Sequence, residues 1–335
     1  MPAFKVMTWN VENLFRPAPG AAQGEHQRFQ QKLQLLSAVI NQLAPDVVAL
    51  QEVGGLEPLT DVQQALGGNF PHLAISLFPD PRGIRVAILS KHALQDLGTQ
   101  THVVDFPTGP ALDIHDLTGT GGSTPVTRLS RGALHVRVTK QGQTVDVITA
   151  HLKSKLLTFP RPGGSSFEPR DENERAQVGG IALLKRTAES VTLRIVANSL
   201  LEGNPQTPLL LLGDFNDVPE AQTSLLLTGP PGSEIGTEGF SRADQGDDAR
   251  LFNLAPLIPE DRRFSRIHRG RGELLDQIFA SEELLPRGSD NRRRVPVVDS
   301  HIDFQGQLPS IGENPLVRVA EIAPDHAPVT AEFTL

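Results

Sequence analysis

The sequence predicts an α/β fold in which strands and helices are mixed along the whole chain. Residues 46–50 and 208–212 are short apolar runs that are typical of buried strands. Residues 172–201 form a long helical pattern. A second, amphipathic helix is indicated by apolar residues at spacings of four, three, four and three: Phe29, Leu33, Leu36, Ile40 and Leu43. No repeat or linker divides the chain, so we expect a single domain over residues 1–335.

The first half of the chain begins with a strand, a loop and the amphipathic helix. Pro45 ends that helix, because proline cannot continue a helical backbone. A turn rich in proline and glycine at residues 80–83 joins two further strands. In order, we expect a strand at 4–9, a loop at 16–23, the helix up to Leu43, and strands at 46–50, 72–77 and 85–90.

The second half combines a hairpin, a long helix and further strands. Residues 98–127 are polar and rich in Gly, Thr and Pro, so we expect an excursion there. The long helix tolerates Gly179 and Gly180 at about 1 kcal/mol each relative to alanine. In order, we expect hairpin strands at 133–139 and 144–151, a loop at 159–166, a helix at 172–201, a strand at 208–212, a short helix at 220–227, and strands at 274–280 and 328–335.

The composition excludes several classes of protein. The chain contains no cysteine, which rules out disulfides, thiolate catalysis and cysteine-ligated zinc, and it contains no tyrosine to act as a phenol nucleophile. No apolar run approaches the roughly 18 residues that span a membrane. The net charge of −8 disfavours a nucleic-acid binder unless a local basic patch exists. We expect a monomer. We place it in the cytoplasm because no leader precedes residues 4–9, although a processed leader is the alternative.

Asp214 and Asn216 form the most informative pattern in the chain. They follow the apolar run at residues 208–212, with Gly213 in between. In extended backbone, positions i and i+2 point the same way, so we expect both side chains to converge at the end of a buried strand. Strand ends are a usual place for a site in α/β proteins.

Polar groups suited to metal and phosphate chemistry also follow other predicted strands. Hard divalent cations such as Mg²⁺ prefer oxygen ligands, usually carboxylates with water and substrate phosphate. Oxygen ligands of this kind are offered by Asn10, Glu12, Glu52, Asp214, Asn216 and Asp325. Imidazoles can donate to a phosphoryl oxygen or act as acid and base, and a carboxylate can fix their tautomer. These roles fall to His151, His326 and Asp276.

Each of these features has a structural explanation when it is taken alone. The Asp214 segment fits a helix N-cap, and Glu52 at a strand end is usually solvated. A single His151 is more often structural than catalytic, and Asp325-His326 ahead of a proline fits a turn. Taken together, these structural explanations are less plausible, because a random chain would not place such residues at the ends of so many buried strands.

The motifs, in their order along the chain, resemble the endonuclease/exonuclease/phosphatase superfamily, which contains deoxyribonuclease I, exonuclease III, inositol polyphosphate 5-phosphatases and sphingomyelinases. The segments that carry this resemblance span residues 8–328: they are 8–13 (TWNVEN), 50–53 (LQEV), 149–153 (TAHLK), 213–217 (GDFND), 275–278 (LDQI) and 325–328 (DHAP). The chain is similar in particular to the bacterial nuclease-like members.

The resemblance implies a four-layer α/β/β/α sandwich of two packed mixed β-sheets flanked by helices. It implies hydrolysis of a phosphoester that depends on Mg²⁺ or Mn²⁺ and needs no covalent intermediate. On the matching positions, Glu52 binds the metal, Asn10 lies beside it, and Asp325 is near it.

The resemblance also assigns the chemical steps. Asp214 orients or deprotonates the attacking water, and Asn216 holds the phosphate. His151 and His326 stabilise the pentacovalent phosphorus, and Asp276 pairs with His326. Two departures matter. The absence of tyrosine lowers the case for abasic-site repair, and residues 83–90 lack the acid that supports the first histidine in deoxyribonuclease I, which leaves the support of His151 open.

Three cationic residues resemble phosphate contacts of the nuclease members: Arg131, Lys153 and Arg175. The alternative for Lys153 and Arg175 is a solvated surface. A basic cluster also precedes the Asp276 strand and consists of Arg262, Arg263, Arg266, His268, Arg269 and Arg271, with Phe264 placed to stack on a base. Its alternative is a basic loop balanced by acids, namely Asp244, Asp247, Asp248, Glu260 and Asp261.

We therefore expect a metal-dependent phosphodiesterase that acts on nucleic acid, a nuclease. The alternative is a phosphatase or phosphodiesterase for a small or lipid-linked phosphoester. A third possibility, from another class, is a phosphate-binding module without catalysis, and the complete set of acids, amides and histidines argues against it.

Overall fold

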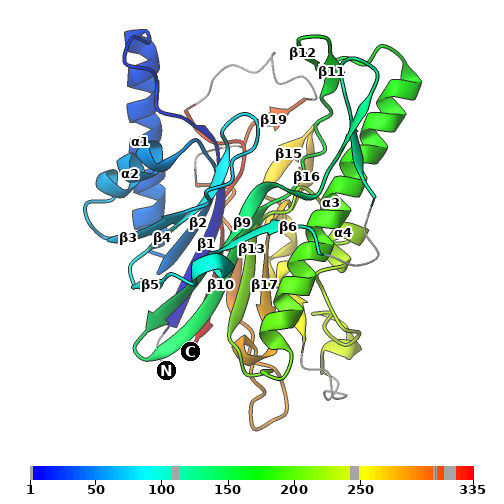
Figure 1. Ribbon diagram of the computed structural model, residues 1–335. Helices are drawn as coiled ribbons and strands as arrows, with labels where there is room; N and C mark the ends of the chain where they lie inside the picture. Colours follow the sequence, from blue (N-terminus) through cyan, green and yellow to red (C-terminus); the bar gives the residue numbers. More distant parts are fainter. Residues whose placement is uncertain (1–2, 108–112, 242–248, 305, 307, 313–321) are drawn as a thin grey trace.

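Two mixed β-sheets pack face to face, and helices cover the outer face of each (Figure 1). The computed structural model describes residues 3–107, 113–241, 249–304, 306, 308–312 and 322–335. In order, the layers are helices α1 (Gln23–Leu43) and α2 (Leu56–Ala65), the first sheet, the second sheet, and helix α3 (Glu172–Leu201). This arrangement confirms the α/β/β/α sandwich that the family resemblance implies.

The first sheet holds the N-terminal and C-terminal strands side by side. β1 (Ala3–Leu14) runs parallel to β2 (Val47–Val53) and antiparallel to β20 (Val329–Thr334). The order across the sheet is β18 (Val297–Ser300), β20, β1, β2, β4 (Arg85–Ser90) and β3 (His72–Ile75). Because β1 and β2 are parallel, their carboxyl ends lie at the same edge.

The second sheet is built around another parallel pair. β10 (Gln143–His151) is parallel to β13 (Leu209–Asp214), which is antiparallel to β17 (Asp276–Ser281). The order across the sheet is β14 (Leu251–Asn253), β17, β13, β10, β9 (Arg128–Lys140) and β5 (Leu94–Gln95), and β6 (His102–Asp105) also pairs with β9. The register sets His151 beside Asp214 on the adjacent strand.

β13 is apolar on both sides because both of its faces are covered. Leu210 and Leu212 belong to the core between the two sheets, whereas Leu209 and Leu211 pack with residues of α3. Each fully buried leucine contributes about 1.5–3 kcal/mol of transfer free energy. An unbroken apolar run is therefore what a central strand of this layered fold requires.

Helix α1 packs its apolar stripe on the outer face of the first sheet, in one cluster with Trp9. Phe29, Leu33 and Ile40 of this stripe are buried there. The helix ends at Leu43, since the next residue takes a left-handed conformation with φ of 50° immediately before the proline. The predicted end of the helix is thus confirmed.

The predicted loop at residues 159–166 is instead a small hairpin, formed by β11 (Phe159–Arg161) and β12 (Gly164–Ser166). Two short strands with proline and glycine carry no alternating apolar signal, so the sequence does not reveal them. The expected excursion at 98–127 contains β6, which pairs with β9, and the hairpin β7 (His115–Leu117) and β8 (Ser123–Pro125). Residues 108–112 of this excursion lie outside the described residues.

The remaining elements are short. A small sheet contains β15 (Arg266–His268), β16 (Arg271–Glu273) and β19 (Ser310–Ile311), and helix α4 (Gln222–Leu225) is shorter than the predicted 220–227. Single 3₁₀ turns occur at Gly98–Thr101, Glu238–Ser241, Ala255–Leu257, Glu260–Arg262 and Glu282–Leu284. Within the described part of the chain, no helix combines the length and the apolar character needed to cross a membrane.

Candidate active site

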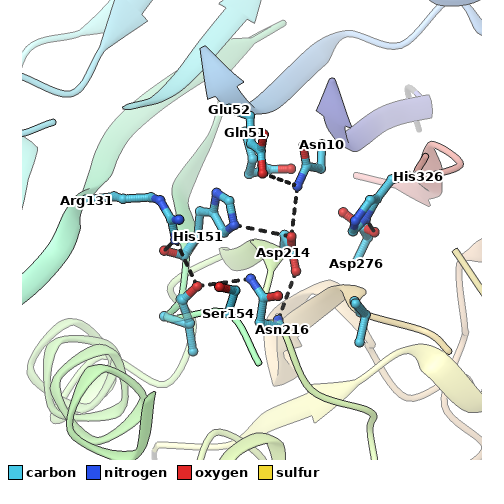
Figure 2. A network of polar contacts seen from close by, with 12 residues as sticks. Asn10, Gln51, Glu52, Arg131, His151, Ser154, Asp214, Asn216, Asp276 and His326 are labelled. Atoms are coloured by element: carbon cyan, nitrogen blue, oxygen red, sulfur yellow. Dashed lines mark hydrogen bonds and ion pairs between the residues drawn. The ribbon is translucent and has the colours of Figure 1, made fainter. Parts of the chain in front are cut away.

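Three predicted site residues lie in one row across the second sheet. His151 ends β10, Asp214 ends β13 beside it, and Asp276 begins β17 on the other side of Asp214. Asn10, from β1 of the first sheet, reaches across to the same point. Figure 2 shows these side chains turned toward one another. The layered packing therefore brings together residues that are far apart in the sequence.

Gly213 allows the two central strands to come this close. Its φ is 153°, and a Cβ at this position would lie 1.9 Å from the carbonyl oxygen of Ala150. Any side chain would push β13 away from β10. The glycine ahead of Asp214 is thus a requirement of the strand pairing that places His151 beside Asp214.

Asn216 reaches the site by a different route from the predicted one. Its backbone is left-handed, with φ of 53°, so the expectation of extended backbone from Asp214 to Asn216 is wrong. The backbone N–H of Asn216 donates to Asp214 Oδ1 at 2.9 Å, and its side-chain amide donates to the carbonyl of Leu152 at 3.0 Å. Glu52 is also left-handed, with φ of 65°, and such conformations in non-glycine residues cluster at functional sites.

Asp214 is the centre of the polar network. Its Oδ2 accepts a hydrogen bond from Asn10 Nδ2 at 2.9 Å and lies 3.3 Å from His151 Nε2 (Figure 2). The residue is 1% exposed. The Nδ1 atom of His151 is buried and has no hydrogen-bond partner among the described residues. The carboxylate support of His151 that the sequence left open is therefore not found in this part of the chain.

His326 is held from two sides. Its Nδ1 lies 2.6 Å from Asp276 Oδ2, and its carbonyl accepts from Trp9 Nε1 at 2.8 Å. The hydroxyl of Ser265 accepts the backbone N–H of Asp276 at 3.1 Å, which fixes the start of β17. One ligand atom from each of Asp214, Asp276 and His326 falls within 4.8 Å of the others.

Burial and neighbouring charges set the two histidines apart. Burial, together with the charges of Arg131 and His326, holds the pKa of His151 well below its usual range. Burial would also lower the pKa of His326, but the charges of Asp276 and Asp325 outweigh it and raise that pKa to about 10. At neutral pH, His151 is neutral and His326 is an imidazolium. Opposite shifts in paired titratable groups are typical of acid–base sites.

Asp214 is shifted as well. Burial, and to a smaller extent the charge of Asp276, raises the pKa of Asp214 to about 6, although His326 and the hydrogen bond from Asn10 oppose this rise. Desolvation is the dominant cause, since it penalises the ionised carboxylate. A carboxylate with this pKa is ionised at neutral pH and is a stronger base than an exposed aspartate.

The oxygen atoms at the site suit a hard divalent cation. Glu52 Oε1 lies 3.4 Å from Asn10 Nδ2, and Asn10 in turn contacts Asp214. Asp276 Oδ1 is buried without a hydrogen-bond partner among the described residues. Carboxylate oxygens of this kind are the ligands that Mg²⁺ and Mn²⁺ prefer. His326 is unsuited as a ligand while it carries a proton.

Two of the predicted metal residues, Asn10 and Asp325, contact polar groups of the protein itself, and their role at the metal stays a prediction. Asn10 turns its amide nitrogen to the two carboxylates, and its Oδ1 accepts the backbone N–H of Glu12 at 2.9 Å. Asp325 Oδ2 lies 3.4 Å from Arg266 Nε, and the Asp325 N–H donates to Glu12 Oε2 at 3.2 Å. In this arrangement Asn10 lies between the two carboxylates, and Asp325 is buried and forms an ion pair with Arg266.

The sequence matches the Endonuclease/Exonuclease/phosphatase family over residues 7–300. The chain belongs to this family. Members of the Endonuclease/Exonuclease/phosphatase family hydrolyse phosphoesters and generally depend on a divalent metal, so the protein is a phosphoesterase of this family. The match confirms the resemblance that the motifs indicated.

Solved structures share the fold at low sequence identity. The mannosyl-6-phosphatase Bt3783 of Bacteroides thetaiotaomicron aligns with a TM-score of 0.54 and 15% identity, over 99% of this chain and 100% of that chain. Truncated TDP2 of Caenorhabditis elegans aligns at 0.50 and 15%, over 99% and 98%. An endonuclease/exonuclease/phosphatase of Beutenbergia cavernae aligns at 0.50 and 18%, over 99% and 72%. No curated protein sequence matches the chain.

Two of the three predicted phosphate contacts lie next to the site of this Endonuclease/Exonuclease/phosphatase family member. Arg131 is buried, and its Nε lies 3.2 Å from Asp80 Oδ2 while its Nη1 donates to the carbonyl of Leu152 at 3.1 Å. Lys153 is half-buried, and its ammonium donates to the carbonyls of Ser154 and Leu156. Burial lowers the pKa of Lys153 to about 8. Both cations therefore brace the segment that follows His151.

The third, Arg175, is exposed at the start of α3 and forms an ion pair with Glu172 of the same helix. Three members of the basic cluster, Arg262, Arg263 and Arg266, are also paired within the fold. Arg262 contacts Asp299 and Asp303 at 3.0 and 2.6 Å, and Arg263 donates to the carbonyl of Ile258. Of the acids expected to balance it, Asp244, Asp247 and Asp248 lie outside the described residues.

Phe264 packs on the fold itself. A Cβ on Gly272 would meet the Phe264 ring at 2.8 Å, so the ring lies directly on the backbone of β16. Phe264 is half-buried. Its predicted role as a stacking platform for a base remains a prediction.

Sequence reasoning missed two residues of α3 that contact the backbone next to the active site. Glu189 is buried, and its carboxylate accepts the backbone N–H groups of Ser130 and Lys153 at 2.9 and 2.6 Å. Arg186 donates to the carbonyl of Lys153 at 3.0 Å and lies 3.2 Å from Asp217 Oδ2. Two charged residues three apart on a helix usually mark a solvated face, so the sequence offered no signal for this role.

Proposed function

We propose that the protein is a divalent-metal-dependent phosphodiesterase that hydrolyses nucleic-acid phosphodiester bonds by direct attack of water. The observation that carries this proposal is the position of Asp214 between a neutral His151 and a protonated His326. The arrangement combines a base, a fixed hydrogen-bond donor and a positive charge at one point. No nucleophilic cysteine or tyrosine exists in the chain to form a covalent intermediate.

Glu52 would hold the metal, with Asp276 and Asp325 close by and Asn10 orienting Glu52. A bound Mg²⁺ or Mn²⁺ ion supplies Lewis-acid polarisation of a phosphoryl oxygen. The oxygen-rich donor set of this site fits such an ion.

The residues of the chain perform the remaining chemistry. Asp214 accepts the proton of the attacking water, since it is ionised at neutral pH and its pKa is raised to about 6. His151 Nε2 lies 3.3 Å from Asp214 Oδ2, so the imidazole packs beside the carboxylate and limits its orientation. Asp276 holds the imidazolium of His326 at Nδ1, which leaves Nε2 as the donor to the oxygens that gain charge in the transition state.

The acids at the reacting point bear on the choice between a diester and a monoester. Glu52, Asp214 and Asp276 gather negative charge around the reacting point, and His326 offsets one of these charges. A phosphate monoester carries a second negative charge that a diester lacks, and like charges a few ångströms apart repel strongly in a buried site. One divalent cation therefore balances a diester better than a monoester.

The alternative is a phosphatase or phosphodiesterase for a small or lipid-linked phosphoester. Arg262, Arg263 and Arg266 already have partners within the fold, which favours this alternative. Fewer cationic groups of the basic cluster are then available to bind the phosphates of a polyanion. The cations near the site must therefore be tested for their effect on long substrates.

A substrate panel tests the proposal. The purified protein is assayed with Mg²⁺ and with Mn²⁺ on plasmid DNA, single-stranded DNA, RNA, inositol phosphates and bis(4-nitrophenyl) phosphate. We expect hydrolysis of a polynucleotide and of the generic diester, with steep loss of polynucleotide affinity as salt rises. Preference for the inositol phosphates with a shallow salt dependence would establish the alternative, and binding without turnover of any compound would identify a phosphate-binding module.

A further inference from the structure

Arg82, in the loop between β3 and β4, is linked to the active site through a single carboxylate. Its Nη2 lies 3.6 Å from Asp80 Oδ2. The same oxygen lies 3.2 Å from Nε of Arg131, whose Nη1 donates to the carbonyl of Leu152. Figure 2 shows Arg131 beside His151. Arg82 therefore lies one carboxylate away from the strand end that carries His151.

Asp80 is already satisfied without the Arg82 guanidinium. Its Oδ1 accepts the backbone N–H groups of Arg82 and Ile84 at 2.8 and 3.0 Å, and its Oδ2 is the partner of Arg131. A separation of 3.6 Å is too long for a hydrogen bond. One carboxylate neutralises one of the two guanidinium groups, so this corner carries a surplus positive charge.

The loop holds its backbone firmly while it leaves the Arg82 side chain in water. The backbone N–H of Gly83 donates to the carbonyl of Asp80 at 2.9 Å, and the N–H of Asp80 donates to the carbonyl of Ile84 at 3.0 Å. The Arg82 side chain is 56% exposed. A guanidinium that is exposed on a fixed backbone is suited to bind an anion from solution. The Lys153 ammonium differs, because it already donates hydrogen bonds to carbonyls of its own segment.

We infer that Arg82 binds a phosphate of the substrate next to the one that is cleaved, so that the enzyme selects a chain of phosphodiesters over an isolated phosphoester. The inference rests on the proposed phosphodiesterase function and deepens it. A guanidinium presents paired N–H donors that match two phosphate oxygens, which an ammonium cannot do. An isolated phosphoester bound at Asp214 has no second phosphate to offer.

The test compares two substrates in Arg82→Gln and Arg82→Lys proteins. We expect Arg82→Gln to lower kcat/KM about tenfold on a single-stranded 12-mer of DNA or RNA, mainly through KM, and to reduce its log–log salt slope by about one. On bis(4-nitrophenyl) phosphate the change stays within about twofold. Arg82→Lys recovers part of the loss. The matched control is Arg137→Gln. Arg137 lies on β9, toward the end of the strand that is remote from Arg131 and the active site, so this substitution should leave both rates near those of the wild type.

The outcomes separate this inference from the function on which it rests. Equal loss on both substrates, or no loss on the 12-mer, overturns the role of Arg82. Wild-type turnover of the small diester without turnover of any polynucleotide overturns the role as well, but leaves the phosphodiesterase chemistry standing. If nothing is hydrolysed, the proposed function fails. The role of Arg82 is then tested by measuring the Kd of a fluorescently labelled 12-mer. This Kd should rise about tenfold in Arg82→Gln, and it stays unchanged if the inference is wrong.

Discussion

His151 and Asp214 occupy paired positions at the ends of β10 and β13, and His151 Nε2 lies 3.3 Å from Asp214 Oδ2. The pairing is made possible by the absence of a side chain on Gly213. A neutral imidazole beside a carboxylate of raised pKa provides a base whose orientation is fixed before substrate binds. The relationship leads to predictions about chemistry and about stability.

Replacement of Asp214 by Asn removes the proposed base. We expect kcat on a phosphodiester to fall by about 10²–10⁴-fold, the usual range for loss of a general base, while far-ultraviolet circular dichroism stays unchanged. A rate near that of the wild type in Asp214→Asn would remove Asp214 from the chemistry.

The same substitution has a stability effect of opposite sign. Burial raises the pKa of Asp214 to about 6 from its ordinary value of 3.8, so the folded state loses stability as pH rises between these values. In metal-free buffer at pH 8, the neutral amide avoids this penalty. We expect Asp214→Asn to raise Tm at pH 8 and to change it little at pH 4. A lower Tm at pH 8 would show that the buried carboxylate stabilises the fold.

The Asp276–His326 pair predicts the alkaline limit of activity. Burial lowers the pKa of His326 and the charge of Asp276 is the largest cause that raises it, to about 10. The folded pKa lies above the unfolded value, so the protonated form persists until pH approaches 10. Asp276→Asn should therefore move the alkaline fall of kcat/KM, measured with Mg²⁺, to lower pH. An alkaline limb at the same pH in both proteins would contradict the assignment of His326 as the charged donor.

Glu189 should act on the reaction only through the segments that it holds. Glu189→Gln replaces one acceptor oxygen with a donor and breaks one of the hydrogen bonds from Ser130 and Lys153. We expect kcat to fall about 10- to 100-fold with KM little changed, since misplacement of about 1 Å has effects of this size. The matched control is Glu202→Gln at the exposed end of α3. Equal kinetics in both variants would limit Glu189 to a structural role.

Alanine substitutions at two glycines should change the stability of the fold in opposite directions. Gly213→Ala places a Cβ 1.9 Å from a carbonyl oxygen, so we expect loss of soluble protein or a destabilisation above about 4 kcal/mol. Gly180→Ala lies in α3 with no atom within 4 Å and should stabilise by about 1 kcal/mol. Urea unfolding measures both. A Gly213→Ala protein of wild-type stability would show that the strands can separate without penalty.

Much of the fold was predictable, because buried strands and helices leave a strong pattern of apolar residues in the sequence. The leucine run of β13 must be apolar on both faces in a layered fold, and the stripe of α1 must face the sheet. The order of the motifs then fixed which strand ends carry polar groups. The hairpin at residues 159–166 was missed because short strands made of proline, glycine and serine bury little.

The site was less predictable, because side-chain direction depends on backbone detail. Asn216 is left-handed, so its convergence with Asp214 arises from a turn and not from extended backbone. Asn10 presents nitrogen to the carboxylates, which composition and order cannot foresee. Glu189 contacts backbone N–H groups of distant segments, and Asp80 joins Arg82 to Arg131, and neither contact leaves a motif.

The central claim is that Glu52 and its neighbouring carboxylates hold a divalent cation at a phosphodiester-cleaving site. It is tested most directly by the rate of bis(4-nitrophenyl) phosphate hydrolysis by chelator-stripped protein as Mg²⁺ or Mn²⁺ is restored. We expect no turnover without metal, saturable recovery in the wild type, and a weaker apparent metal affinity in Glu52→Gln. Full turnover by the stripped protein, or an identical metal dependence in Glu52→Gln, would contradict the account.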